Sequence, residues 1–301
     1  MIPSLRVLVA PFIAMLSACS PAGLVNALTP HSTYELRVNI PYEAGDRHSL
    51  DVYSPRRPQS SGAPSPLIVF FYGGSWQTGD RKDYLFVGEA LAARGYVTVI
   101  PDYRRYPQTI FPGFMDDAAA AVAWAQAHAI DFHADPQRIF LMGHSAGAHI
   151  AMLLATDRRY LAQHGVDAGA LAGVVGLAGP YDFLPLQDPT LEQIFPMGTR
   201  KDSQPINHVD GAEPPIFLGV GMDDHTVDPG NTTRFAARLE AFGDRFELKS
   251  YAGINHAMIV GSFGRPVRSL SGLITVAPVL DDVSRFIDSL DGGQRSGAAS
   301  R

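Results

Sequence analysis

The order of apolar and polar side chains along the chain changes near residue 66. Residues 34–40 and 48–53 alternate apolar and polar positions, which indicates strands with one buried face, and their proximity predicts an antiparallel pair. Residues 67–71 and 96–100 are instead continuous apolar runs, which are typical of strands buried on both faces of a parallel sheet. We therefore expect antiparallel strands at the start, followed by parallel ones.

Helical and extended patterns alternate through the rest of the chain. We expect helices over residues 82–94, 114–129, 146–155 and 232–242 and within 270–290, and strands over 138–142, 171–177, 216–220 and 246–251. This alternation predicts βαβ units and thus an α/β fold, with a mostly parallel central sheet and helices on both faces. Sheets of this kind place ligands at the carboxyl ends of their strands.

Composition separates this domain, residues 34–290, from its flanks. Residues 54–66 are rich in Pro, Ser and Gly and are expected to form a loop. Residues 19–33 are interpreted as a short tether, and the Gly- and Ser-rich residues 291–301 as a disordered tail.

The first residues have the features of an export signal. Arg6 precedes an apolar run over residues 7–16, which is too short for a spanning helix of about 20 residues. Leu16-Ser17-Ala18-Cys19 resembles the bacterial lipobox, which implies that residues 1–18 are a lipoprotein-type signal peptide. By that resemblance Cys19 is lipidated and anchors an exported bacterial lipoprotein in a membrane, facing the periplasm or in the outer membrane. The alternative is an ordinary secretory signal with an incidental cysteine.

Charge and cysteine content exclude some partners and some covalent links. Hydrophobic residues make up 46% and charged residues 18% of the chain, as in globular proteins. The net charge is −6 and no basic cluster is present, so nucleic acid is not expected as a partner. Cys19 is the single cysteine, so disulfides within the chain are excluded.

A strand-to-helix junction carries the first candidate for chemistry. Gly143-His144-Ser145-Ala146-Gly147 follows a predicted strand and opens a predicted helix. In this context the serine lies on a strained turn that exposes its hydroxyl above the sheet, at the positive end of the helix dipole. The motif predicts that Ser145 is a nucleophile.

The loop after the first buried strand is the candidate oxyanion hole. Its sequence, Tyr72-Gly73-Gly74-Ser75, departs from the His-Gly-Gly-Gly pattern, since tyrosine replaces the histidine and serine the third glycine. The two glycines can still turn their amides toward the nucleophile. We assign the hole to the N–H groups of Gly73, Gly74 and Ala146, and expect Tyr72 to order the loop rather than act as an acid.

The acid and the base are expected downstream, in the order Ser, Asp, His. Asp223, Asp224 and Asp228 all follow the strand predicted over 216–220. Asp224 stands three residues before Val227, which resembles hydrolases whose acid precedes a valine–proline-like turn by three residues. This resemblance favours Asp224, with Asp223 second. The other aspartates are expected to cap the next helix or to lie in solvent.

His256 follows the last predicted strand and is the candidate base. It would take the Ser145 proton and return one to the leaving alcohol, while Asp224 holds its tautomer. His144 and His149 flank the serine, but their spacing matches no metal motif. No metal is therefore expected.

Several further motifs resemble one group of enzymes. They are Gly74-Ser75-Trp76, Gly79-Asp80, Pro101-Asp102-Tyr103-Arg104, Asp135-Pro136, Arg138-Ile139 and the segment from Gly143 to His149. They look like those of α/β-hydrolase serine esterases related to hormone-sensitive lipase, kynurenine formamidase and isoprenylcysteine methylesterase. The resemblance implies the α/β-hydrolase fold and ester or arylformamide hydrolysis without a cofactor.

Besides the missing histidine of the oxyanion motif, a second departure from that group concerns the cover of the site. The long N-terminal helical cap of hormone-sensitive-lipase relatives is absent, because strands begin near Tyr34. Residues 180–215 are the expected covering segment, and Asp102 and Arg104 are expected to fix the loop after a strand. We expect a carboxylesterase for small-molecule or polymer-borne esters, with short-chain or aryl esters favoured. The alternatives are a formamidase-type amidase and a non-catalytic binding protein on the same fold.

Overall fold

The computed structural model describes residues 20–57 and 62–298 of the chain. The predicted signal peptide and Cys19 lie outside the described residues. The described strands are β1 (Tyr34–Pro41), β2 (Ser49–Pro55), β3 (Ser65–Phe71), β4 (Val97–Pro101), β5 (Ala134–His144), β6 (Gly173–Leu177), β7 (Ile216–Gly221) and β8 (Phe246–Tyr251). The α-helices are α2 (Pro21–Ala27), α3 (Leu85–Ala92), α4 (Gly113–Ala127), α5 (Ala146–Thr156), α6 (Arg159–Gln163), α7 (Pro189–Ile194), α8 (Gly230–Phe242), α9 (His256–Gly261), α10 (Arg265–Arg268) and α11 (Val279–Ala298). Short 3₁₀ turns are η1 (Arg81–Tyr84), η2 (Ala129–Phe132), η3 (Ala168–Ala170) and η4 (Pro205–Asn207).

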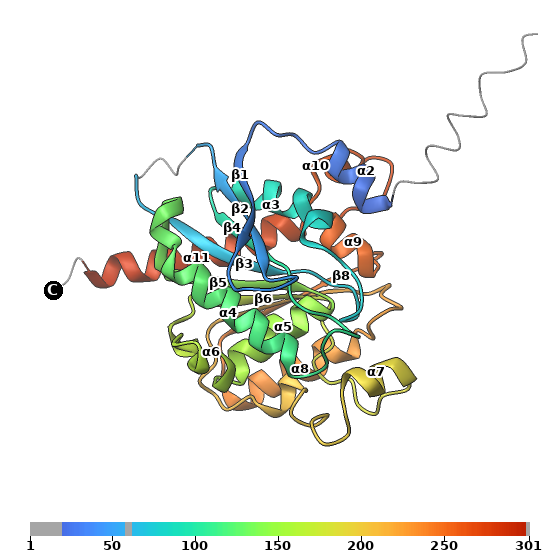
Figure 1. Ribbon diagram of the computed structural model, residues 1–301. Coiled ribbons are helices and arrows are strands. Elements are labelled where there is room, and N and C mark those ends of the chain that lie inside the picture. Colours follow the sequence, from blue (N-terminus) through green and yellow to red (C-terminus); the bar gives the residue numbers. More distant parts are fainter. Residues whose placement is uncertain (1–19, 58–61, 299–301) are drawn as a thin grey trace, which may run out of the picture.

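The described strands form one twisted sheet in the order β1-β2-β4-β3-β5-β6-β7-β8 (Figure 1). β1 pairs antiparallel with β2, and β2 antiparallel with β4, whereas the neighbouring pairs from β4 to β8 are parallel. The predicted architecture, a mostly parallel sheet that begins with antiparallel strands, is confirmed.

The central strands are buried because helices cover both faces of the sheet (Figure 1). Every residue of β3, β4, β6 and β7 is buried, as their continuous apolar sequences predict. α5 packs against β3, β5 and β6 and is buried along its whole length. This central position gives the residues at the start of α5 a rigid support.

The segment that was predicted to be a tether contains a helix instead. Ser20 caps α2, since its Oγ accepts a hydrogen bond from the N–H of Gly23 at 3.0 Å, and Pro21 occupies the first turn, where no N–H is needed. The Asn26 side-chain amide donates to the carbonyls of Lys82 and Asp83, at 2.9 and 3.1 Å. α2 is therefore docked on the domain.

The C-terminal region also differs from the prediction. α11 continues to Ala298, so residues 291–298, which were predicted to be disordered, have helical backbone. Within residues 20–57 and 62–298, we find no helix with both the length and the apolar character needed to cross a bilayer.

Candidate active site

Ser145 occupies the sharp turn between β5 and α5. Its backbone has φ 56° and ψ −124°, a conformation that non-glycine residues rarely adopt. Two close approaches require the flanking glycines. A Cβ on Gly143 would lie 2.1 Å from the Gly147 carbonyl oxygen, and one on Gly147 would lie 2.0 Å from that of Phe71. The Ser145 N–H also donates to the carbonyl of Leu177 at 2.9 Å, which fixes the turn to the end of β6.

Asp224 and His256 meet at the ends of β7 and β8. The Nδ1 atom of His256 lies 2.7 Å from Oδ2 of Asp224, and the Asp224 carboxylate is buried. Its other oxygen, Oδ1, accepts the N–H groups of Thr226 and Val227, at 2.8 and 2.9 Å. The carboxylate is thus held in one orientation, with one oxygen on the loop and the other on the imidazole.

The other two candidate aspartates are exposed. Oδ1 of Asp228 accepts the N–H of Gly230, the first residue of α8, at 3.0 Å, although the N-cap of that helix is Pro229. Asp223 follows Met222 on the exposed side of the loop. The geometry therefore places Asp224, the favoured residue, against His256.

His144 joins the serine turn to the histidine loop. Its Nε2 lies 2.9 Å from the carbonyl oxygen of His256, and the two imidazole rings have centroids 4.8 Å apart. Burial, followed by the nearby His256, lowers the pKa of His144 to about 3, so the ring is neutral at pH 7. Because Nε2 faces a carbonyl acceptor, it carries the proton, and Nδ1 is left as a buried acceptor without a partner among the described residues.

The loop after β3 lies against the serine. A Cβ on Gly73 would lie 2.9 Å from Cβ of Ser145 and 3.1 Å from the carbonyl of His144, so no other residue fits at this position. Gly74 has φ 131°, and its carbonyl accepts the N–H groups of Gln77 and Thr78, each at 2.9 Å. Ala146 is the first residue of α5, and its N–H has no acceptor within the helix.

Tyr72, the first residue of this loop, is fixed by buried hydrogen bonds. Its hydroxyl donates to Oδ1 of Asp102 at 2.8 Å and accepts from Nη2 of Arg47 at 2.6 Å. The Tyr103 hydroxyl donates to the Tyr72 carbonyl at 2.7 Å, and the two rings stack at 4.7 Å. Burial raises the pKa of Tyr72 well above its usual value, so the hydroxyl stays neutral. Tyr72 therefore positions the loop and is not placed to act as an acid.

Sequence reasoning missed the rest of this buried network. Arg47, in the connection between β1 and β2, donates to Asp102 at 3.0 Å and to the carbonyls of Gly79 and Tyr103. Arg81 pairs with Asp102 and, at 2.9 Å, with Asp51. The available signal was Asp51 itself, a carboxylate within a strand whose neighbours are buried and apolar, because a buried charge requires a partner.

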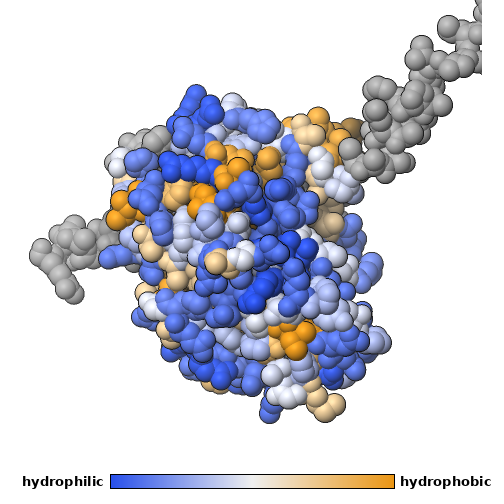
Figure 2. Space-filling model, in the orientation of Figure 1, coloured by the Kyte–Doolittle hydropathy of each residue, from blue (hydrophilic) through white to orange (hydrophobic). Residues whose placement is uncertain are grey.

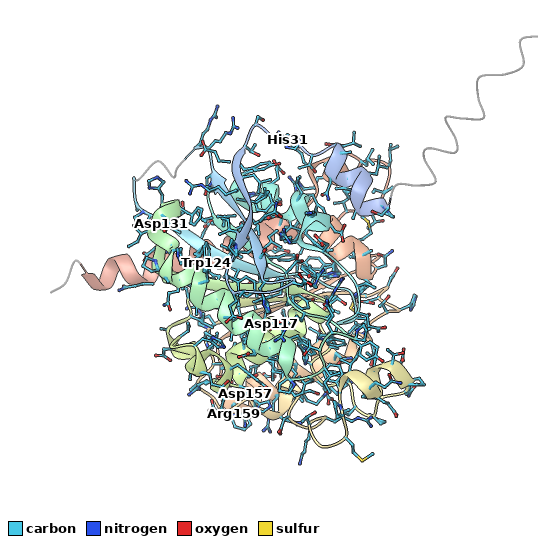
Figure 3. The ribbon with its side chains drawn as sticks, viewed as in Figure 1. His31, Asp117, Trp124, Asp131, Asp157 and Arg159 are labelled. Atoms are coloured by element: carbon cyan, nitrogen blue, oxygen red, sulfur yellow. The ribbon has the colours of Figure 1, made fainter. Side chains whose placement is uncertain are left out.

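Arg104, which was expected to fix the loop after β4, pairs with α4. Asp117, labelled on α4 in Figure 3, accepts from the Arg104 backbone N–H at 2.8 Å and from its Nε at 3.0 Å. The same loop follows Asp102 and Tyr103, so this pair contributes to the support of the candidate oxyanion hole.

The covering segment, residues 180–215, contacts α5 and the loop that follows β3. His149 on α5 is fully buried, and its Nε2 lies 2.7 Å from the carbonyl of Ser203. Burial lowers the pKa of His149 to about 4. Phe195 packs edge-on against Trp76, with ring centroids 4.8 Å apart. Across residues 20–57 and 62–298, no three His, Cys, Asp or Glu side chains are grouped to hold a metal ion.

Two clefts adjoin the candidate catalytic residues. The first, called here the Trp76 cleft, has a volume of about 480 Å³ and is bounded by Trp76, Ser145, Ala146 and the covering segment. The second, called here the α2 cleft, has a volume of about 620 Å³. It is bounded by Gly73, Gly74, His144 and His256 and by residues of α2 and α9. Both volumes are within the range of small-molecule sites.

Comparisons with known proteins identify the family. The BD-FAE family model matches residues 50–239, more than half of the chain. The chain is similar to Esterase LipC of Mycobacterium tuberculosis, with 32% identity over 232 residues, covering 70% of this chain and 57% of that protein. It is also similar to the probable isoprenylcysteine alpha-carbonyl methylesterase ICMEL1 of Arabidopsis thaliana, with 27% identity, covering 73% of this chain and 51% of that protein. The chain thus spans only about half of the length of these relatives.

Solved structures give the fold. Esterase B from Lactobacillus rhamnosis superposes with a TM-score of 0.76 and 18% identity, covering 97% of this chain and 96% of that one. The predicted α/β-hydrolase fold is confirmed.

Proposed function

The chain belongs to the BD-FAE family, and we propose that it hydrolyses carboxylic esters with Ser145 as nucleophile, His256 as general base and Asp224 as the acid that orients it. The observation that carries the proposal is the 2.7 Å contact between His256 and Asp224. It is supported by the φ of 56° at Ser145, whose neighbour His144 lies against His256. The relatives named as esterases support the reaction class.

In the proposed mechanism, Oγ of Ser145 attacks the ester carbonyl while Nε2 of His256 takes its proton. Asp224 accepts the Nδ1–H of His256, and so keeps Nε2 free to act as the base and stabilises the imidazolium. His256 then protonates the leaving alcohol, and an acyl-enzyme remains on Ser145. Water activated by the same histidine releases the acid and restores the serine.

The oxyanion of each tetrahedral intermediate would be bound by the N–H groups of Gly73, Gly74 and Ala146. Donors in such sites contribute roughly 3–4 kcal/mol each to transition-state stability. The buried contacts of Tyr72 with Arg47 and Asp102 support this role, because a donor is effective only where its position is fixed before the charge develops.

We expect small substrates, with short-chain or aryl esters favoured, since both clefts are small-molecule sized. The test is hydrolysis of p-nitrophenyl acetate, butyrate and laurate by the wild type and by Ser145→Ala, together with an aryl formamide. Turnover of the esters that disappears in Ser145→Ala is expected. A folded wild type that cleaves only the formamide would replace the proposal with an amidase, and one that cleaves neither would favour a binding protein.

The second part of the proposal concerns location. We infer that the protein is an exported lipoprotein, anchored in a membrane through lipidated Cys19. Its support is the Leu16-Ser17-Ala18-Cys19 sequence. Several acyl chains give stable anchoring where a single chain is marginal. In bacterial cells, Cys19→Ser should move the protein from the membrane to the soluble fraction and abolish lipid labelling. Membrane retention of that variant without lipid labelling would contradict the anchor.

A further inference from the structure

The cleft next to His256 has a wall that comes from the very start of the described chain. Ser20, Pro21, Ala22 and Val25 of the α2 region line the α2 cleft, together with residues of α9. Figure 1 shows α2 beside α10 and close to α9, far in sequence but adjacent in the fold. The segment predicted to be a tether is therefore part of the candidate substrate site.

This wall is built on the domain through side-chain contacts. Asn26 accepts the N–H of Phe86 at 3.1 Å, besides donating to the carbonyls that precede α3. On the other side, a Cβ on Gly264 would lie 2.9 Å from Cγ1 of Val25, so α2 packs closely on the start of α10. α2 is thus held both by hydrogen bonds to residues 82–86 and by packing on Gly264.

The lining of the α2 cleft is mostly apolar. Tyr84 and Phe86 adjoin α2, and Ala257, Met258 and Val260 form the α9 side. The charged lining residue, Asp83, already accepts the N–H of Asp80 at 3.1 Å. Figure 2 shows that apolar residues also gather on the surface around α2. Such a cleft favours an apolar group over a hydroxyl-rich or anionic one.

The chemistry of the proposed reaction decides which half of the ester enters it. His256 must protonate the leaving oxygen, so the alcohol half lies on the histidine side of the reacting carbon. His256 borders the α2 cleft, whereas Ser145 and Ala146 border the Trp76 cleft. This step rests on the proposed function.

We propose that the α2 cleft binds the alcohol half of the substrate, that it selects apolar alkyl or aryl alcohols, and that α2 is a specificity-determining wall. The Trp76 cleft then holds the acyl half. The substrate class is an ester of an apolar alcohol.

Two isomeric esters test the assignment, because hexyl acetate and ethyl hexanoate contain the same atoms with the longer chain on opposite sides. In the wild type, kcat/KM for hexyl acetate should exceed that for ethyl acetate by about tenfold or more, because the hexyl group adds four methylenes to the apolar cleft. Ala22→Trp would fill the α2 cleft and should abolish that advantage, chiefly through KM, while ethyl hexanoate stays within about twofold. Ala27→Trp is the matched control, since Ala27 is on the same helix, exposed and outside the cleft.

A second variant keeps the proposal testable if Ala22→Trp fails to fold. Asn26→Ala removes the anchor of α2 without adding bulk, and it should raise KM for hexyl acetate with kcat for ethyl acetate unchanged. If Ala22→Trp and Asn26→Ala leave hexyl acetate unaffected, or if they reduce ethyl hexanoate instead, the assignment is overturned. Absence of Ser145-dependent hydrolysis of every ester would instead overturn the proposed function.

Discussion

Replacement of Asp224 by asparagine tests the proposed triad at one atom. Oδ1 of Asp224 accepts the N–H groups of Thr226 and Val227, at 2.8 and 2.9 Å. The oxygen of the new amide must occupy that position, since an NH₂ group there would face two donors. The NH₂ group then faces Nδ1 of His256, which lies 2.7 Å from Oδ2 in the wild type. Nδ1 must become an acceptor, so the ring proton moves to Nε2.

That tautomer cannot accept the Ser145 proton. In Ser–His–Asp hydrolases, replacement of the triad aspartate by asparagine lowers kcat by about 10⁴. This corresponds to about 5.4 kcal/mol of transition-state stabilisation. The fold should tolerate the change, because the side chain keeps its shape and both loop hydrogen bonds. The weaker neutral acceptor should cost about 1 kcal/mol of unfolding free energy.

The assay is kcat on p-nitrophenyl acetate, with urea unfolding of the same samples. Asp223→Asn is the matched control, since Asp223 is the neighbouring residue and is exposed. It should retain activity within about threefold of the wild type, because exposed side chains contribute little. If Asp224→Asn keeps more than a tenth of wild-type kcat, or if Asp223→Asn loses more than Asp224→Asn, the assignment of the acid is wrong.

Three further changes address the supports of the site. Tyr72→Phe removes the hydroxyl bonded to Asp102 and should cost about 1–3 kcal/mol in urea unfolding and lower kcat; an unchanged kcat would contradict the positioning role. Gly147→Ala places a Cβ 2.0 Å from the backbone oxygen of Phe71 and should cost about 3 kcal/mol or more; a Tm equal to that of the wild type would contradict the close packing. His149 has its pKa lowered by burial from 6.5 to about 4, so its stabilising effect is complete above pH 6.5 and is lost as the pH falls toward 4. His149→Gln, which keeps a donor and does not titrate, should lose about 3 kcal/mol less than the wild type over that window; parallel unfolding curves against pH would refute this.

The centre of the sheet could be predicted from the sequence because a strand buried on both faces has a continuous apolar sequence. β3 and β4 are continuous apolar runs, and the structure places them side by side in the parallel part of the sheet. The turn at Ser145 was equally accessible, since glycine is required where backbones approach this closely. Among the aspartates, spacing relative to Val227 favoured Asp224, and the structure places that residue against His256.

The features that the sequence did not predict share a physical cause. Each depends on contacts between segments that are far apart in the chain. α2 is seven residues long and has no buried residue, so neither length nor periodicity marks it as structural. Its position depends on Asn26, whose hydrogen bonds reach 56 to 60 residues along the chain. The pairing of Arg47 with Asp102 spans 55 residues and likewise leaves no local pattern.

Through these long-range contacts, the N-terminal part of the chain reaches the candidate site, although it is far from Ser145 in the sequence. Arg47 donates to the Tyr72 hydroxyl and to the carbonyl of Gly79, so the connection between β1 and β2 holds both ends of the candidate oxyanion loop. α2 borders the cleft on the histidine side. Because a transition state is stabilised only by groups already in position, the connection between β1 and β2 supports the candidate oxyanion loop from outside the parallel core that carries Ser145.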